Sequence, residues 1–136
     1  FSVILIGGAG VIAGIGTDIC DIRRIEKAVK KSCFLEKGYT KKEIEQSKGR
    51  SSSLAGNFAV KEAVSKALGT GFRGFGPQQI EVLRQESGAP YVQLYGKALE
   101  IMEEKGIDRF FVSISHEKEY AIAYVVAEKE EKEMGQ

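Results

Sequence analysis

The sequence of 136 residues predicts an α+β fold: a compact antiparallel-sheet domain with one long helix and shorter helices. Its β-prone runs occur as close pairs separated by turn residues, which is the order of antiparallel hairpins. Helical segments precede or separate these pairs instead of alternating with single strands, so a parallel doubly wound sheet is not expected. The chain is long enough for one hydrophobic core and too short for two, so we expect a single domain.

The N-terminal part is expected to begin with a strand and a basic helix. Residues 11–15 are β-prone and should form a short strand that ends in a turn at Gly16-Thr17-Asp18. Residues 21–31 follow a helical period, with apolar residues such as Ile22 and Ile25 on one face. After position 21 this segment has one acidic residue and five basic residues, which are Arg23, Arg24, Lys27, Lys30 and Lys31. Such a lopsided face indicates an acidic partner, although it could also be an ordinary solvated surface.

Two further helices are expected before the C-terminal strands. Thr40 and Glu43 have the spacing of a capping box and predict a short helix that begins at Thr40. Residues 48–53 are polar and predict a loop. Residues 54–68 are rich in alanine and valine and predict the main helix. Gly69-Thr70-Gly71 should end it, because glycine suits the left-handed conformation at a helix C-terminus.

The C-terminal half is expected to contain two strand pairs and one helix. After a glycine-rich loop, the predicted elements are strands 80–84 and 91–94, a helix over 97–105, and strands 109–115 and 120–127. We assign residues 11–128 to the folded domain and the charged residues 129–136 to a frayed tail. Residues 1–10 lack an initiator methionine and the basic start of a signal peptide, so we expect an upstream or non-native extension.

The composition argues against several classes of function. The apolar fraction is 43%, the charged fraction is 29% and the formal net charge is +1, so bulk charge favours no nucleic acid or membrane partner. The sequence has no run of about 18 apolar residues that could cross a bilayer. Cys20 and Cys33 are too few for a disulfide framework, so we expect a reduced, cytoplasmic protein.

Three polar segments interrupt otherwise apolar stretches and contain the candidate chemistry. The segments are Gly14–Asp18, Phe58–Gly69 and Ser113–His116. Their ionisable candidates are Asp18, Glu62, Lys66 and His116, the single histidine. Carboxylate oxygens bind a hard divalent cation, and a positive group beside the cation suits phosphate-ester chemistry. Because the segments are far apart in sequence, this hypothesis requires a fold that unites them.

Each candidate also has a purely structural interpretation. Glu62 and Lys66 fall on one face of the predicted helix, where an exposed i,i+4 pair stabilises a helix by only about 0.2–0.5 kcal/mol. Asp18 could cap the helix that begins near Asp21. His116 could be an ordinary surface residue of a turn.

The N-terminal glycines offer a different class of function. Gly8, Gly10 and Ala13 match the spacing of a dinucleotide-binding fingerprint after a strand, which would suit a nicotinamide-dependent oxidoreductase. That fingerprint needs a helix directly after the glycines to bind a pyrophosphate. Residues 11–16 are β-branched and interrupted by glycine, so this class is kept only as an alternative.

Together the polar segments resemble the holo-[acyl-carrier-protein] synthase family, the short trimeric class of phosphopantetheinyl transferases. The resemblance covers residues 12–127. The matching motifs are Gly16-Thr17-Asp18 with Arg24 six residues on, Phe58-x-x-Lys61-Glu62-Ala63-x-Ser65-Lys66-Ala67-x-Gly69-Thr70-Gly71, Gly88-x-Pro90, and Ser113-Ile114-Ser115-His116 followed by Tyr120-Ala121. One departure concerns an arginine that the family often places directly before the helix phenylalanine, where this chain has Asn57. If that arginine contacts the coenzyme's phosphates, Arg50 or Arg73 would have to replace it.

The resemblance implies a reaction and a site. The reaction transfers 4′-phosphopantetheine from coenzyme A to a serine of apo acyl carrier protein, for fatty acid biosynthesis, and leaves adenosine 3′,5′-bisphosphate. The implied catalytic residues are Asp18 and Glu62, which would hold Mg²⁺, and Lys66, which would contact the diphosphate. Two acceptors for the serine proton stay open: Glu62 and a water molecule on the metal. The residues implied to line the coenzyme cleft are Ser65, Lys66, Gly69, Gly88, Pro90 and His116.

The resemblance also implies partners. It implies a homotrimer with active sites at the subunit interfaces. It implies an acidic carrier protein that meets the basic helix at Arg23, Arg24, Lys27 and Lys31. The alternative to an enzyme is a non-catalytic module that binds carrier protein, which would need the basic helix but not Asp18 and Glu62 together.

Overall fold

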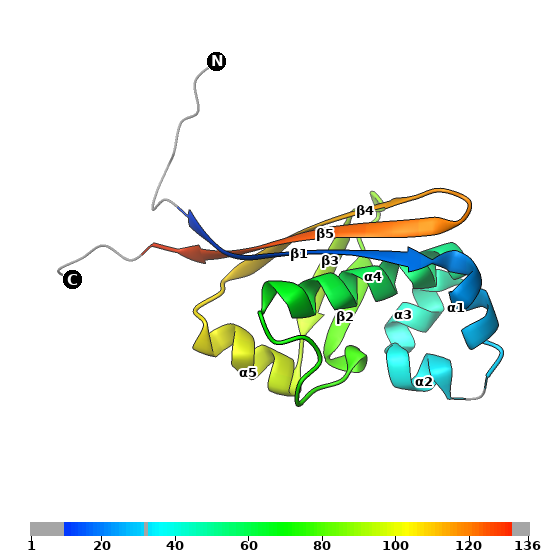
Figure 1. Ribbon diagram of the computed structural model, residues 1–136, viewed down its shortest axis with the longest axis horizontal. Helices are drawn as coiled ribbons and strands as arrows, with labels where there is room; N and C mark the ends of the chain where they lie inside the picture. The colour runs from blue at the N-terminus through cyan, green and yellow to red at the C-terminus, as the bar shows by residue number, and fades with distance from the viewer. Residues whose placement is uncertain (1–9, 32, 132–136) are drawn as a thin grey trace, which may run out of the picture.

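The computed structural model describes residues 10–31 and 33–131, which form two antiparallel sheets around one long helix (Figure 1). In chain order the elements are β1 (Gly10–Asp21), α1 (Ile22–Ala28), α2 (Phe34–Gly38), α3 (Lys41–Ser47), α4 (Ser51–Ala67), the 3₁₀ helix η1 (Pro77–Gln79), β2 (Ile80–Arg84), β3 (Pro90–Leu94), α5 (Gly96–Glu104), β4 (Arg109–His116) and β5 (Tyr120–Glu130). One sheet has the strand order β1-β5-β4, and β2 pairs with β3 in the other. The predicted α+β class is confirmed.

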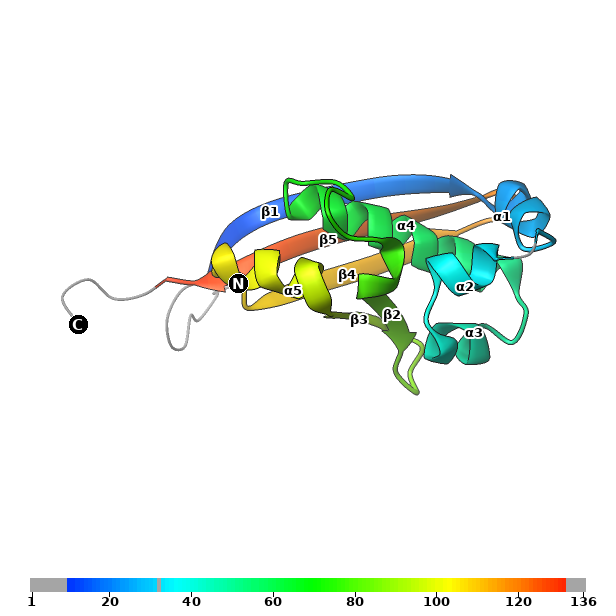
Figure 2. The ribbon, with the colours of Figure 1, turned by 90° about the horizontal axis from the view of Figure 1, so that it is seen from below.

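Helix α4 lies along one face of the three-stranded sheet and forms the centre of the core (Figure 2). Helices α1, α2 and α3 gather toward one end of the molecule, and α5 lies toward the other. The buried residues between helix and sheet are mostly small, among them Ala59 and Ala63 of α4 and Ala121, Ala123 and Ala127 of β5. Small side chains on both surfaces let the helix and the sheet pack closely.

Strand β1 contacts α4 most closely at two glycines. A Cβ atom added at Gly14 would clash with the carbonyl oxygen of Ala67, and one added at Gly16 would clash with that of Ala63. Only glycine therefore fits at these positions. Because side chains alternate along a strand, Asp18 lies on the same side of β1 as Gly14 and Gly16. The close docking of β1 consequently directs Asp18 toward α4.

Several element boundaries differ from the sequence-based prediction. β1 does not turn at residues 16–18 but runs to Asp21, because it pairs with β5 along its length. The basic helix ends at Ala28 rather than at residue 31. The predicted loop over 48–53 is wrong from residue 51 onward, because three serines form the first turn of α4. The sequence does not predict α2, because five residues are too few to show a helical period.

The remaining predictions agree with the structure. Thr40 and Glu43 form the predicted capping box at the start of α3. The other helix and the four C-terminal strands lie within three residues of their predicted limits. Pairing of β1 with β5 includes Gly10 and Glu130, slightly beyond the predicted domain limits. Residues 1–9 and 132–136 lie outside the described residues, so the origin of the extension and the fraying of the tail stay predictions. No described helix combines the length and hydrophobicity needed to cross a membrane.

The face of the three-stranded sheet opposite α4 is open and largely apolar. Ile15 and Ile19 of β1, Phe111 of β4 and Tyr124 of β5 are each at least 51% exposed. Tyr124 lies between the other strands, opposite Thr17 of β1. Exposed apolar side chains gathered on one face indicate an interaction surface. We call this surface, defined by Ile15, Ile19, Phe111 and Tyr124, the outer sheet face.

Candidate functional site

The docking of β1 on α4 brings two of the three candidate segments together. Lys66 of α4 donates from Nζ to the main-chain oxygen of Thr17, at 2.9 Å, and to Oδ1 of Asp18, at 3.3 Å. The ion pair of Lys66 is therefore made with Asp18; within the described part of the chain Lys66 has no ion pair with Glu62. Asp18 does not cap α1 either, because Asp21 does so by accepting a hydrogen bond from the Arg23 main-chain nitrogen.

Asp18 and Glu62 line one pocket of about 400 Å³ where β1, α1 and α4 meet. Phe58 precedes Glu62 by one helical turn and lines the same pocket. Arg24 of α1 also lines it, as does Phe34 of α2. With Asp21, the lining of this pocket contains one cation, three carboxylates and two aromatic rings, so two of the three candidate segments meet at one hollow.

The carboxylates of Asp18 and Glu62 repel each other in this pocket. The pKa of Glu62 is raised above its ordinary value, first by burial and then by the negative charge of Asp18, whereas the positive charge of Lys66 lowers it. A cation between the carboxylates would remove this repulsion. Mg²⁺ commonly takes one or two carboxylates and completes its shell with water and substrate phosphates. Asp18 and Glu62 therefore fit a magnesium ion as donors.

The other α4 candidates lie outside this pocket. Ser65 is buried, and its hydroxyl donates to the carbonyl oxygen of Glu62 at 2.6 Å, so the side chain satisfies its own helix. Gly69 is exposed just beyond α4 and has a φ of 80°, which a residue with a Cβ rarely adopts. The main-chain nitrogens of Thr70 and Gly71 donate to the Ser65 carbonyl oxygen and end the helix, as the sequence predicts.

The remaining candidates lie in other parts of the molecule. Gly88 lies in the turn between β2 and β3 and lines a different pocket, of about 500 Å³, together with Arg50 and Asn57. Pro90 begins β3, beside this turn. His116 ends β4 and lines a third hollow, which also includes Arg50. A single chain therefore does not bring Gly88, Pro90 and His116 to Asp18 and Glu62.

The basic residues of α1 border the first pocket. Arg24 lines it, and Arg23 is held at its edge by ion pairs with Asp21, at 3.8 Å, and Glu119, at 4.0 Å. Lys27 is exposed in the last turn of α1, and Lys31 lies beyond the end of the helix. The structure thus places positive charge beside the Asp18–Glu62 pocket, although the basic helix is shorter than the sequence predicts.

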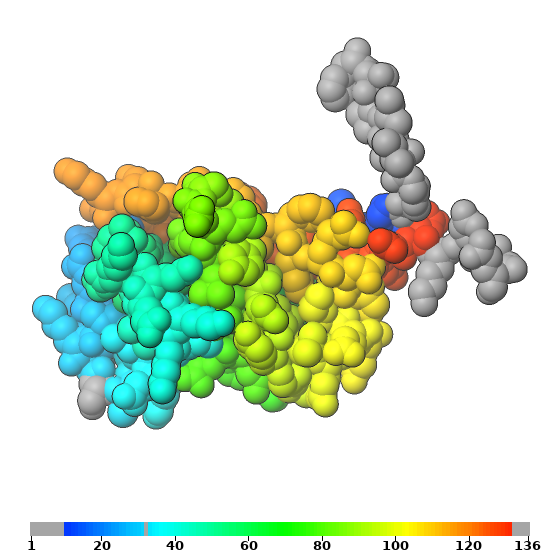
Figure 3. All heavy atoms as spheres, turned by 180° about the vertical axis from the view of Figure 1, so that it is seen from behind, coloured from blue at the N-terminus to red at the C-terminus, as the bar shows by residue number. Residues whose placement is uncertain are grey.

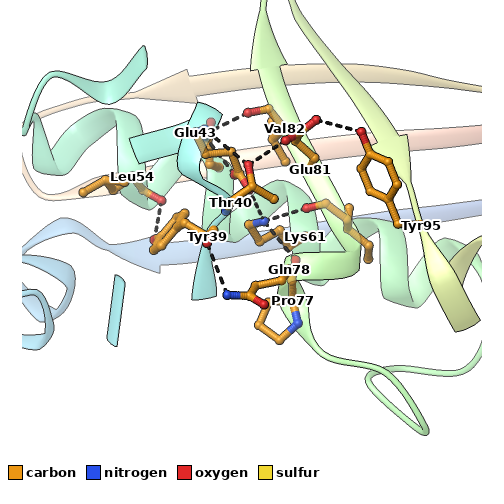
Figure 4. Close-up of polar contacts among 12 residues, drawn as sticks. Tyr39, Thr40, Glu43, Leu54, Lys61, Pro77, Gln78, Glu81, Val82 and Tyr95 are labelled. Atoms are coloured by element: carbon orange, nitrogen blue, oxygen red, sulfur yellow. Dashed lines mark hydrogen bonds and ion pairs between the residues drawn. The ribbon is translucent and has the colours of Figure 1, made fainter. Parts of the chain in front are cut away.

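Lys61, which the sequence analysis names only as part of a motif, is fully buried next to Glu62 in the chain (Figure 4). Lys61 Nζ donates to Oε1 of Glu43 at 2.7 Å and to the carbonyl oxygens of Pro77 and Ile80 at 2.9 and 2.6 Å. Burial lowers the pKa of Lys61 and raises that of Glu43, whereas their mutual attraction opposes both shifts. These bonds join α4 to α3, η1 and β2, and so fix the position of the helix that carries Glu62.

The helical period could have identified Lys61. It lies three and seven residues before Val64 and Leu68, which are both completely buried. Lys61 therefore shares the apolar face of α4, where a charge needs a partner. The partner itself, Glu43, was visible only as half of the capping box.

The nicotinamide alternative does not agree with the fold. Residues 10–21 form strand β1, where the dinucleotide fingerprint requires the start of a helix. Gly8 itself lies outside the described residues. Without the helix N-terminus this glycine pattern has no means to bind a pyrophosphate.

Comparison with known proteins identifies the family. The sequence model of the 4′-phosphopantetheinyl transferase superfamily matches residues 14–125. The chain is 48% identical over 118 residues to the holo-[acyl-carrier-protein] synthase of Lachnoclostridium phytofermentans, covering 87% of this chain and 97% of that protein. It is 51% identical over 122 residues to that of Clostridium beijerinckii, covering 87% and 98%.

A solved structure gives the same result. The crystal structure of Helicobacter pylori holo-[acyl-carrier-protein] synthase in complex with coenzyme A superposes with a TM-score of 0.76 at 42% identity, covering 83% of this chain and 98% of that one. The match includes the strand of Asp18 and the helix of Glu62, which form the first pocket. This chain belongs to the 4′-phosphopantetheinyl transferase superfamily.

Proposed function

We propose that this protein is a holo-[acyl-carrier-protein] synthase, which transfers 4′-phosphopantetheine from coenzyme A to a serine of apo acyl carrier protein. The observation that carries the proposal is the shared pocket of Asp18 and Glu62, with Lys66 bonded to Asp18. Two relatives that match 87% of this chain bear the same name. The product set would be holo carrier protein and adenosine 3′,5′-bisphosphate.

The charges of the pocket suit attack on a diphosphate. When bound by Asp18 and Glu62, Mg²⁺ would supply positive charge to the diphosphate oxygens. Lys66 is half exposed beside Asp18, so its ammonium group can contact the same phosphates and protonate the leaving phosphate. Glu62 and a water molecule on the metal are the two candidate acceptors for the proton of the attacking serine hydroxyl.

The decisive experiment measures mass. The protein is incubated with coenzyme A, Mg²⁺ and an apo acyl carrier protein, and the carrier is weighed intact. We expect the mass of one phosphopantetheine group to be added, and we expect chelation of the metal to prevent it. A carrier that binds this protein but stays unmodified would instead indicate a non-catalytic binding module.

We further propose a homotrimer whose sites lie between subunits. Gly88 and His116 line other hollows than Asp18 and Glu62 on one chain. A neighbouring copy could place its own His116 against the first pocket, where it would position a coenzyme phosphate. The outer sheet face supplies the apolar surface that such an assembly would bury.

Charge on the outer sheet face is expected to break this assembly. The wild-type protein should sediment near three times the chain mass of 14.9 kDa. The double substitution Ile15→Lys and Tyr124→Lys should give a monomer that has lost transfer activity, because buried lysines without partners are costly. Leu99→Lys on α5, which is 36% exposed, is the matched control and should remain trimeric and active. A monomeric wild type with full activity would contradict the proposal.

The basic residues beside the pocket are expected to bind the carrier protein. Arg24→Glu and Lys27→Glu should each raise the KM for apo carrier protein by about threefold or more, because acyl carrier proteins are acidic and charge pairs steer association. Affinity for coenzyme A should change little in Lys27→Glu, because Lys27 does not line the first pocket. Added salt should weaken carrier binding more in the wild type than in these variants.

The control for this prediction is Lys41→Glu at the start of α3, an equally exposed lysine away from the first pocket. It should leave the KM for the carrier unchanged. If Arg24→Glu and Lys27→Glu behave like Lys41→Glu, or weaken coenzyme binding instead, α1 is not the carrier surface.

The sequence-based expectation of a cytoplasmic location stays a prediction.

A further inference from the structure

The small residues between α4 and the three-stranded sheet do not by themselves set the rotation of α4 about its axis. Ala59 and Ala63 belong to this buried layer, and the carbonyl oxygens of Ala63 and Ala67 lie against the glycines of β1. Such packing is stabilised mainly by the burial of apolar surface, which has no preferred direction. A fixed rotation therefore needs directional bonds elsewhere on the helix.

Lys61 makes such bonds on another side of α4. Its ammonium group donates to Oε1 of Glu43 on α3 at 2.7 Å, and to the carbonyl oxygens of Pro77 and Ile80 at 2.9 and 2.6 Å (Figure 4). These three acceptors use all three of its protons. Glu43 is held in turn, because its Oε1 also accepts from the main-chain nitrogen of Thr40 at 3.1 Å. The buried ammonium group thus joins α4 to α3, η1 and β2 at once.

The rotation that Lys61 fixes decides where Glu62 points. The two residues are consecutive on α4, so their side chains are directed about 100° apart around the helix axis. Lys61 points toward α3 and β2, whereas Glu62 lines the first pocket with Asp18. A rotation of about 10° would move a side-chain tip by about 1 Å, because a helix with its side chains is about 10–12 Å wide. A misplacement of about 1 Å can cost about 10²-fold in rate.

Lys61 also supports the aromatic wall of the first pocket. Its Nζ lies 5.4 Å from the centre of the Tyr39 ring. The Tyr39 ring meets the Phe34 ring edge-on, with 6.0 Å between the ring centres, and the Phe34 ring lies 6.4 Å from that of Phe58. Phe34 and Phe58 both line the first pocket. The contacts of Lys61 therefore reach this pocket by two routes, through the backbone of α4 and through the aromatic rings.

We propose that Lys61 and Glu43 are positioning residues for the transfer reaction, which hold Glu62 and the aromatic wall in the arrangement that the reaction needs. This inference rests on the proposed function. Neither Lys61 nor Glu43 lines the first pocket, so both act through other residues. A buried ion pair adds little net stability, because apolar residues of similar volume often replace both partners without loss. The directional bonds of the pair instead specify one arrangement of the helices.

The test replaces both partners with apolar residues of similar length, in the double variant Lys61→Met and Glu43→Met. Its Tm should exceed that of Lys61→Met alone, because neither charge is left unpaired. Its kcat should nevertheless fall at least about tenfold, whereas the KM for the carrier should change less than about threefold. Its dissociation constant for Mn²⁺, measured by electron paramagnetic resonance without substrate, should rise at least about threefold. All assays are run well below the Tm of each variant.

Ile101→Ala is the matched control for lost packing. Ile101 is a buried residue of α5, which lies at the opposite end of the molecule from α2 and α3 (Figure 3). Its truncation should lower the Tm, yet leave kcat and the Mn²⁺ dissociation constant within about twofold of the wild type. An equal loss of kcat in Ile101→Ala and the double variant would overturn the proposal, because any damage to the core would then have this effect.

A double variant that keeps either the wild-type kcat or the wild-type Mn²⁺ affinity also overturns the proposal. If the double variant does not fold, Glu43→Gln decides, because it keeps the shape and one acceptor oxygen but removes the counter-charge of Lys61. It should raise the Mn²⁺ dissociation constant at least about twofold, and an unchanged constant would refute the positioning role. If the wild type transfers nothing but these affinities change as expected, the positioning of Glu62 stands and the proposed function fails.

Discussion

Glu62→Gln is expected to lower Mg²⁺-dependent transfer by about 10²–10⁴-fold, the usual cost of removing a general base. The variant keeps the shape of the side chain but loses a metal donor and the proton acceptor that the pocket provides with Asp18. Asp18→Asn should also abolish most transfer, yet less severely, because only the metal donor is lost. Turnover is measured by intact mass of the carrier at several Mg²⁺ concentrations. Near wild-type turnover of both variants at low Mg²⁺ would show that the assignment is wrong.

The same variant should make the metal-free protein more stable, which separates lost chemistry from lost fold. The folded-state pKa of Glu62 lies above its ordinary value. Because the pKa of Glu62 is higher in the folded than in the unfolded protein, the stability that Glu62 contributes is fully present below its unfolded-state pKa. This stability is lost as pH rises through its folded-state pKa. At pH 7 the ionised carboxylate therefore opposes folding, and Gln removes this opposition. The Tm of Glu62→Gln should exceed that of the wild type at pH 7, and the difference should vanish near pH 4.

The matched control for Glu62→Gln is Glu103→Gln, an exposed glutamate on α5. It should change neither the transfer rate nor the Tm, since surface substitutions away from special contacts have small effects. A Tm of Glu62→Gln below that of the wild type at pH 7 would mean that the carboxylate supports the fold. The loss of turnover could then not be assigned to chemistry alone.

Lys61→Met is expected to destabilise the protein by about 3–5 kcal/mol, a large part of the stability of a domain of this size. The lysine side chain is completely buried, and its removal would leave Glu43 as an unpaired buried charge. It would also leave the carbonyl oxygens of Pro77 and Ile80 without this donor. Unfolding in urea measures the free-energy difference. Lys66→Met, on the same helix but half exposed, should cost less than about 1 kcal/mol.

A second substitution tests whether the charge is the cause. Glu43→Gln in the Lys61→Met background should recover part of the lost stability, because it removes the unpaired carboxylate. Recovery should be incomplete, since Thr40 and Asn57 also donate to Glu43. A loss of less than about 1 kcal/mol in Lys61→Met alone would contradict the role of this pair. A double variant that loses more stability than the two single variants lose in sum would also contradict it.

The elements that the sequence predicts best are those with strong local patterns. The capping box of Thr40 and Glu43 and the paired strands predicted at 80–84 and 91–94 follow from spacing and turn residues, which act over a few residues. The boundaries that differ depend on distant partners. β1 continues as a strand through Gly14 and Gly16 because it pairs with β5 and because α4 packs too closely to leave room for a Cβ atom at either position. Taken alone, the two glycines favour a turn.

By itself, the sequence determined the α+β class and the resemblance that named Asp18, Glu62 and Lys66, because motif spacing is carried along the chain. Only the tertiary structure decided which of these residues meet. The docking of β1 on α4 joins Asp18 to Lys66, and Gly88 and His116 lie in other hollows. It also decided the partners of Lys61, because contacts between residues far apart in sequence arise only when helices and strands pack.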